Sequence, residues 1–204
     1  IPPASPLPSH HPSQPSHPLS PIPLSPRIML EERALDSYYN ILFSILEFWR
    51  RNGQTAASWP ERLTIVSHAF KRARLVDSHC AAIGFPLDRV AFIGINPPNL
   101  PAALLAADKA SQELAAAGGL APGEVSEEKA EAMKGVRETV GLWSDDPHGV
   151  GKVLVGKRRT RNPWGVSQTL FLHDEERARS GAETRTVGGT EALVEGGTRP
   201  WEKT

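Results

Sequence analysis

Proline is distributed unevenly along this chain of 204 residues, and its distribution limits where a folded domain can lie. Ten of the 19 prolines fall within residues 1–26, and the first charged side chain of the sequence is that of Arg27. A stretch with so many prolines and no charges cannot bury a core. We therefore expect residues 1–27 to be a disordered, Pro/Ser-rich segment and the folded domain to follow it.

Six of these early prolines fall on one three-residue phase, which matches the three residues per turn of polyproline II. They are Pro3, Pro6, Pro12, Pro15, Pro18 and Pro21. One interpretation is a ligand for a domain of the SH3 or WW type that binds Pro-rich segments. The other is a tail without a partner, and it is favoured because no Arg or Lys stands at the usual flanking position of a PxxP ligand.

Beyond the proline segment, helical and strand patterns alternate. Apolar residues at three- and four-residue steps predict a helix over 31–51, and a second helix is expected over 69–83. Short β-branched runs predict strands at 62–67 and 90–95, and helical composition returns at 101–117 and 124–141. This alternation predicts an α/β domain over residues 28–166, with parallel strands and helices on both faces of the sheet.

Two features make this domain look incomplete. Two parallel strands leave both sheet edges unpaired, so we expect the sheet to be truncated on its N-terminal side. Residues 167–204 contain five glycines and only scattered apolar residues, so they are expected to form a Gly-rich flexible tail.

Charge and composition exclude several classes of function. The 23 basic and 23 acidic residues balance, which argues against nucleic acid as a partner. No apolar run approaches the roughly 20 residues that span a bilayer, so no membrane span is expected. Neither a signal peptide nor a metal-binding Cys/His spacing is recognisable, and the expected location is cytoplasmic.

The end of the first predicted strand carries the residues best suited to bind a ligand. In parallel sheets, ligands bind beyond the carboxyl ends of the strands. Ser67 could cap the next helix there, and basic side chains on its first turns add positive charge. A small anion is the expected ligand; the alternative is a capped helix with a solvated basic face. The candidate ligand-binding residues are Glu31, Ser37, Asn40, Ser67, His68, Lys71 and Arg74.

These candidates carry different weight. Ser37 and Asn40 are three residues apart and share one helix face, but ordinary capping and exposure would also explain them. His68 could act as a general acid or base, although a loop histidine is more often structural. No catalytic residue is assigned. A basic run at 152–161, between Trp143 and Trp164, is interpreted as a C-terminal arm held on the domain, with phosphate contact as the alternative.

Three blocks of this sequence form a recognisable pattern. Residues 30–44 read LEERALDSYYNILFS, residues 64–74 read TIVSHAFKRAR, and the third block joins residues 146–149 to residues 157–164. Together they resemble the YdcF-like proteins, a domain of unknown function (number 218) that includes SanA and ElyC, and the third block looks like the fungal, cytoplasmic branch. The resemblance covers about residues 30–165 and corresponds to the C-terminal half of the family only.

The resemblance implies a Rossmann-like three-layer α/β fold and a small-molecule pocket. Its ligand would be S-adenosylmethionine or another nucleotide-like molecule. In the second block Ser67, Phe70 and Arg74 match the family pattern, whereas Lys71 stands where bacterial members usually carry His. The leading hypothesis is a domain that binds a small anionic or nucleotide-like ligand. The alternative is an inactive, truncated interaction protein that acts through its Pro-rich tract or its basic arm.

Overall fold

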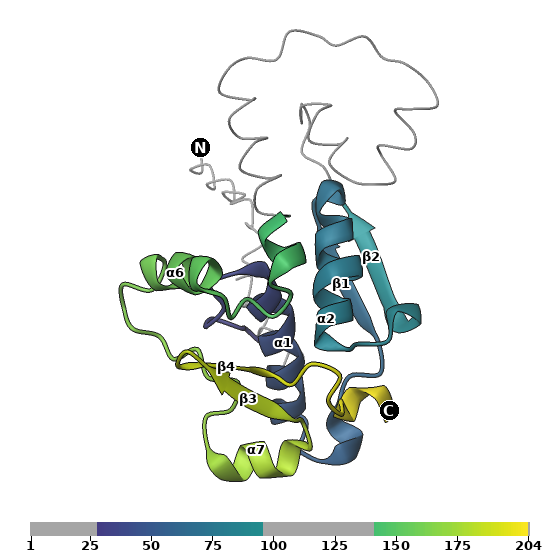
Figure 1. Cartoon of the computed structure of the whole chain (residues 1–204). Coiled ribbons are helices and arrows are strands. Elements are labelled where there is room, and N and C mark those ends of the chain that lie inside the picture. Colours follow the sequence, from purple (N-terminus) through teal and green to yellow (C-terminus); the bar gives the residue numbers. More distant parts are fainter. Residues whose placement is uncertain (1–27, 96–140, 204) are drawn as a thin grey trace, which may run out of the picture. The chain divides into compact units, whose positions relative to one another are not determined.

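The computed structural model describes residues 28–95 and 141–203, and the chain divides into two compact units, Ile1–Leu30 and Glu31–Thr204 (Figure 1). Every element described below belongs to the second unit. The expected Pro-rich segment, the predicted helix at 101–117 and all but the last residue of the predicted helix at 124–141 lie outside the described residues.

Helix α1, Ser37–Arg51, supplies the largest part of the core. It begins six residues later than predicted because Asp36 is its N-cap: the Asp36 carboxylate accepts a hydrogen bond from the backbone N–H of Tyr39 at 2.9 Å. Eight of its fifteen residues are buried, and Arg50 and Arg51 lie in its last turn. Their positive charge is favourable at a helix C-terminus.

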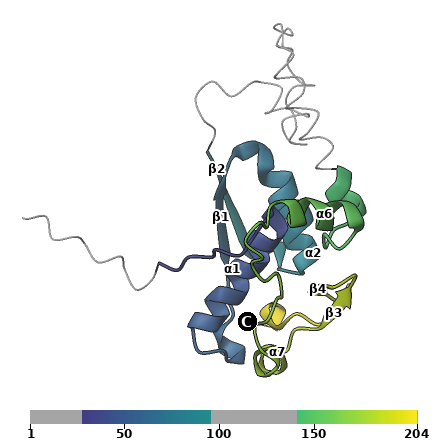
Figure 2. The same cartoon turned by 90° about the vertical axis from the view of Figure 1, so that its left-hand side faces the viewer.

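A strand–helix–strand unit follows α1. Strands β1, Leu63–Ser67, and β2, Val90–Gly94, pair in parallel with Leu63 opposite Val90, and Ser67 opposite Gly94 (Figures 1 and 2). Alternate residues on one face pack against the core, whereas the other face exposes apolar side chains such as Ile93. The predicted α/β character is confirmed, and the parallel sheet within the described residues has two strands.

The connection between the two strands is helical in three different ways. A 3-10 turn, Ala69–Lys71, leads into a π-helical stretch, Ala73–Cys80, and then into the short α2, Ala81–Ile83. Gly84 ends the helix with φ +73°, a left-handed conformation that glycine adopts without strain. The predicted extent, 69–83, agrees with these bounds, although the winding is not a regular α-helix.

The segment expected to be a flexible tail is instead ordered and packed into the core. It forms helix α7, Asp174–Ser180, and an antiparallel hairpin of β3, Thr184–Val187, and β4, Thr190–Leu193. Leu170, Leu193 and Trp201 are fully buried in the same cluster as α1. The prediction was wrong because these apolar residues have no regular spacing, and their burial depends on contacts with distant residues.

The basic run is also helical. Helix α6, Lys152–Thr160, carries it, and 3-10 turns at Ala56–Ser58, Leu87–Arg89 and Pro200–Lys203 complete the described elements. Trp143 is buried, as expected for an anchor of this region, whereas Trp164 is 84% exposed and anchors nothing. The predicted domain end at residue 166 therefore has to be moved to the end of the described chain.

Candidate functional site

A groove of about 390 Å³ lies between the start of α1, the end of β1 and the helical stretch that follows β1. Five of the seven predicted ligand-binding residues line it: Ser37, Asn40, Ser67, Lys71 and Arg74. The sheet geometry explains this, because β1 delivers its following residues to the edge where α1 begins. Apolar side chains of β1 and of the neighbouring helices form the rest of the wall.

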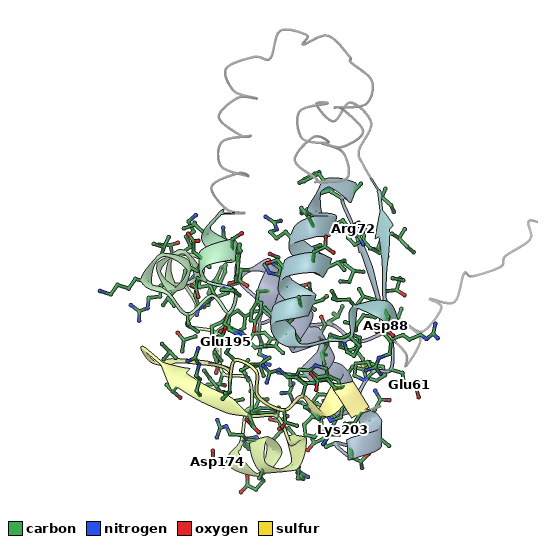
Figure 3. All side chains as sticks on the ribbon, turned by 45° about the vertical axis from the view of Figure 1, so that its right-hand side comes forward. Glu61, Arg72, Asp88, Asp174, Glu195 and Lys203 are labelled. Atoms are coloured by element: carbon green, nitrogen blue, oxygen red, sulfur yellow. The ribbon has the colours of Figure 1, made fainter. Side chains whose placement is uncertain are left out.

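Arg74 is the most unusual residue of the groove. Its guanidinium has no hydrogen bond or ion pair within the described residues, and its Nε atom is buried without a partner. Burial lowers the pKa of Arg74. Arg72, labelled in Figure 3, is different: it is exposed and lies 3.2 Å from the Asp77 carboxylate. Arg74 thus keeps a positive charge in a half-buried place where no carboxylate of the described residues compensates it.

Lys71 adds a second positive charge to the same groove. Its pKa is lowered, first by burial and then by the charge of Arg74. Its ammonium lies 5.9 Å from the centre of the Phe70 ring, and no carboxylate pairs with it among the described residues. Two like charges side by side repel each other, so an anion bound between them would lower the energy of both.

Ser37 forms a hydrogen bond with a histidine that the sequence analysis had not linked to the site. The Oγ atom of Ser37 lies 2.9 Å from Nε2 of His79, whose ring is completely buried. Burial, with a further contribution from the charge of Arg74, lowers the pKa of His79 to about 3. The ring is therefore neutral at pH 7 and carries a single N–H.

The tautomer of His79 decides what Ser37 offers to a ligand. If Nε2 carries the hydrogen, His79 donates to Ser37 Oγ, and the serine hydroxyl is free to donate into the groove. If Nδ1 carries it, Ser37 donates to His79 and presents only lone pairs to the groove. An anion in the groove favours the first tautomer.

The negative charge nearest the groove is already compensated. Asp36 lines the groove, but its carboxylate pairs with Arg158 at 2.9 Å, and both side chains are almost fully buried. Arg158 also donates a hydrogen bond to the backbone carbonyl of Gly149. The groove therefore keeps its positive character despite the acid in its wall.

A second pocket of about 270 Å³ adjoins the groove and shares three residues with it: Asp36, Ser37 and Arg74. Lys157 and Arg161 contribute its cationic side, from α6 and from the residue that follows α6. The basic run that was interpreted as an arm thus lies beside the predicted site. Neither Lys157 nor Arg161 has a carboxylate partner in the described part of the chain.

Two predicted site residues do not line the groove. The Glu31 carboxylate accepts hydrogen bonds from the backbone N–H groups of Arg33 and Ala34, at 2.7 and 3.1 Å, and so fixes the entry to α1. His68 stacks on Phe70, and its Nδ1 lies 3.1 Å from the carbonyl oxygen of Ile95. Ser67 lines the groove but does not cap the helix, because His68 occupies the N-cap position and makes no capping hydrogen bond.

The described residues contain no cluster of His, Cys, Asp or Glu that could hold a metal ion. Among them, no helix is long and apolar enough to cross a membrane. The donors that face the groove are cationic groups, hydroxyls and one amide, and this set suits a phosphate or carboxylate group.

Comparison with known proteins gives one relative. The chain is 28% identical over 160 residues to the uncharacterized protein YOR238W of Saccharomyces cerevisiae. The matched stretch covers 76% of this chain and 46% of the yeast protein, so the chain spans about half the length of this relative. No family model matches the chain. No solved structure matches it either.

Proposed function

We propose that this chain binds a small anionic, nucleotide-like ligand in the groove between α1 and the end of β1. The observation that carries the proposal is the uncompensated guanidinium of Arg74, with Lys71 beside it. Leaving a half-buried charge without a partner is unfavourable, and a bound anion would supply that partner.

The neutral groups of the groove support the same ligand chemistry. Helix α1 begins at Ser37, so the positive end of its dipole faces the groove. The Ser37 hydroxyl can donate to an anion when His79 donates to Ser37, and Asn40 and Ser67 add an amide and a hydroxyl. These groups can together satisfy several oxygens of one phosphate or carboxylate.

The YdcF-like resemblance extends this proposal. It adds a Rossmann-like three-layer fold of which the two-stranded sheet would be one part, a cytoplasmic location, and S-adenosylmethionine or a related nucleotide as ligand. The contribution of Ser37, Ser67 and Arg74 to both the resemblance and the groove favours this extension. We assign no reaction, because the titratable groups that line the groove are two cations and one carboxylate that is already paired with Arg158.

Calorimetric titration of the full chain tests the proposal, with inorganic phosphate, adenosine monophosphate and S-adenosylmethionine as probes. We expect at least one of them to bind, and Arg74→Ala and Lys71→Ala each to weaken its binding about ten- to hundredfold, as loss of a charged hydrogen bond predicts. Arg72→Ala is the matched control, because Arg72 lies on the same helical stretch but outside the groove.

Two outcomes would contradict the proposal. One is that none of the three probes binds to the folded chain, which would favour the alternative of an inactive interaction protein. The other is that Arg72→Ala weakens binding as much as Arg74→Ala, since the effect would then reflect general surface charge. Circular dichroism of each variant shows whether it is folded.

A further inference from the structure

We infer that the ligand of this groove carries two adjacent anionic groups, as in a diphosphate, and that the second group binds in the adjoining pocket beside α6. This inference rests on the proposed function and specifies its ligand. Its starting point is that the groove and the adjoining pocket are not separate, because they have Asp36, Ser37 and Arg74 in common.

Arg74 is placed to contact both anionic groups. It is the one unpaired cation within the described residues that lines both hollows. A guanidinium offers five N–H donors in a planar fork, which can bind oxygens of two neighbouring phosphates at once. A lysine at this position would present a single point charge. The shared wall therefore suits a ligand that extends from one hollow into the other.

The cations are divided between the two hollows. Lys71 lines only the groove, whereas Lys157 and Arg161 line only the adjoining pocket. The last two are four residues apart along the C-terminal end of α6, a spacing that places them on one helix face. One Nη of Arg161 donates to the carbonyl of Leu35 at 3.1 Å, which holds its side chain beside the start of α1.

The helix dipole explains only part of this arrangement. Basic residues are favourable at the end of any helix, so α6 alone would account for a basic last turn. The helix dipole does not explain why two of these basic residues, Lys157 and Arg161, share a pocket with Arg74. Arg158, which also lines that pocket, is neutralised by Asp36. Lys157 and Arg161 have no carboxylate partner among the described residues, so the adjoining pocket keeps two positive charges of its own.

A single phosphate would use only half of this charge, because in the groove it would pair with Lys71 and Arg74 and would leave Lys157 and Arg161 without an anion. A diphosphate that bridges the shared wall would be paired on both sides. We therefore expect pyrophosphate to bind more tightly than inorganic phosphate, and adenosine diphosphate more tightly than adenosine monophosphate.

The test is titration calorimetry at constant ionic strength with inorganic phosphate and pyrophosphate. We expect pyrophosphate to bind the full chain at least about tenfold more tightly, the effect of one additional charged hydrogen bond. Lys157→Ala should remove most of this preference by weakening pyrophosphate about tenfold, and should leave phosphate unchanged. Arg74→Ala should weaken both probes.

Lys152→Ala is the matched control. It removes the same charge from the same helix, but Lys152 lines neither hollow and is exposed. Equal weakening of pyrophosphate by Lys152→Ala and Lys157→Ala would overturn the inference, because overall charge would explain it. Equal affinities of phosphate and pyrophosphate, both reduced by Arg74→Ala, would also overturn the inference and leave the proposed function intact. Binding of neither probe would overturn both.

Discussion

Two half-buried arginines of this chain are in opposite situations. Arg50, in the last turn of α1, forms ion pairs with Glu47 and Glu176, with a distance of 2.6 Å to Glu47. Arg74, on the π-helical stretch, has no partner within the described residues. The ion pairs raise the pKa of Arg50 despite its burial, whereas burial alone lowers the pKa of Arg74.

The difference separates charge that stabilises the fold from charge that is free for a ligand. The Arg50 cluster joins α1 to α7, because Arg50 lies on α1 and its partner Glu176 lies on α7. The Glu176 carboxylate also accepts a hydrogen bond from the backbone N–H of Leu172 at 2.7 Å. Arg74 makes no such connection within the described residues, and a bound anion is the partner that we propose for it.

The largest effect is expected at the structural arginine. Arg50→Gln should lower the free energy of unfolding by about 3 kcal/mol, because it leaves the nearly buried Glu176 carboxylate without its cation. Urea denaturation measures this. Arg51→Gln is the control: Arg51 also pairs with Glu47, but it is mostly exposed, and its removal should cost less than about 1 kcal/mol. Equal costs for the two variants would remove the distinction on which the comparison rests.

Lowering the pH should reduce the stability that the Arg74 region and the Arg50 region contribute to the fold, in a different pH range for each. A buried histidine with a lowered pKa binds its proton more readily when unfolded, so His79 makes stability fall between pH 6.5 and its own pKa of about 3. Its slope is up to about 1.4 kcal/mol per pH unit. The ion pairs of Glu47 and Glu176 lower the pKa values of these carboxylates. The stability that they contribute to the fold is therefore lost only below pH 4.5.

Urea denaturation across pH 4.5–6.5 therefore isolates the histidine contribution. His148, which is buried and has a lowered pKa, contributes in the same direction. We expect His79→Gln to reduce the slope of the free energy of unfolding against pH by the contribution of about one bound proton. This expectation does not depend on how the variant changes stability at pH 7. A slope unaffected by His79→Gln would mean that His79 is not held neutral.

A smaller effect is expected for Arg74→Gln. Because Arg74 has no partner among the described residues, the variant should change the free energy of unfolding by less than about 1 kcal/mol. Removing the repulsion between Arg74 and Lys71 favours an increase in stability. Added phosphate should stabilise the wild-type chain but not the variant, because only a ligand that binds the folded state shifts unfolding. Thermal denaturation with and without phosphate measures both effects. A loss as large as that of Arg50→Gln would show Arg74 to be structural.

The smallest effect is expected on the exposed face of the sheet, outside both regions. Ile93 is half exposed, so Ile93→Thr should change stability by less than about 0.5 kcal/mol. Its neighbour Phe92 faces the core, and Phe92→Ala should cost about 2 kcal/mol or more. If Ile93→Thr proves as costly as Phe92→Ala, this face is covered in solution.

The groove could be predicted from the sequence because its residues follow local rules. Ser67, Lys71 and Arg74 lie directly after a strand, and Ser37 and Asn40 lie three apart on one helix face. The partners that define its electrostatics could not be predicted in this way. His79 meets Ser37 across 42 residues, and Arg158 meets Asp36 across 122, so neither pairing leaves a spacing signal in the sequence.

The fold shows the same limit. Helix α1 has a strong apolar period and was placed correctly apart from its start, where the capping by Asp36 outweighed the apolar pattern before it. Leu170 and Leu193 lie in runs of three apolar residues that are too short to show a helical period, and Trp201 lies between Pro200 and Glu202; they become core only because α1 and its neighbours provide a surface for them. Burial of this kind is a property of the assembled chain and not of any local segment.

The π-helical winding of Ala73–Cys80 decides which side chains share the site. In a regular α-helix, two residues five positions apart point about 140° away from each other. In a π-helix the backbone pairs residues five apart, which brings Arg74 and His79 towards the same side. Arg74 lines the groove together with Ser37, and His79 forms a hydrogen bond with the Ser37 hydroxyl. The winding therefore joins the arginine of the groove to the histidine behind it.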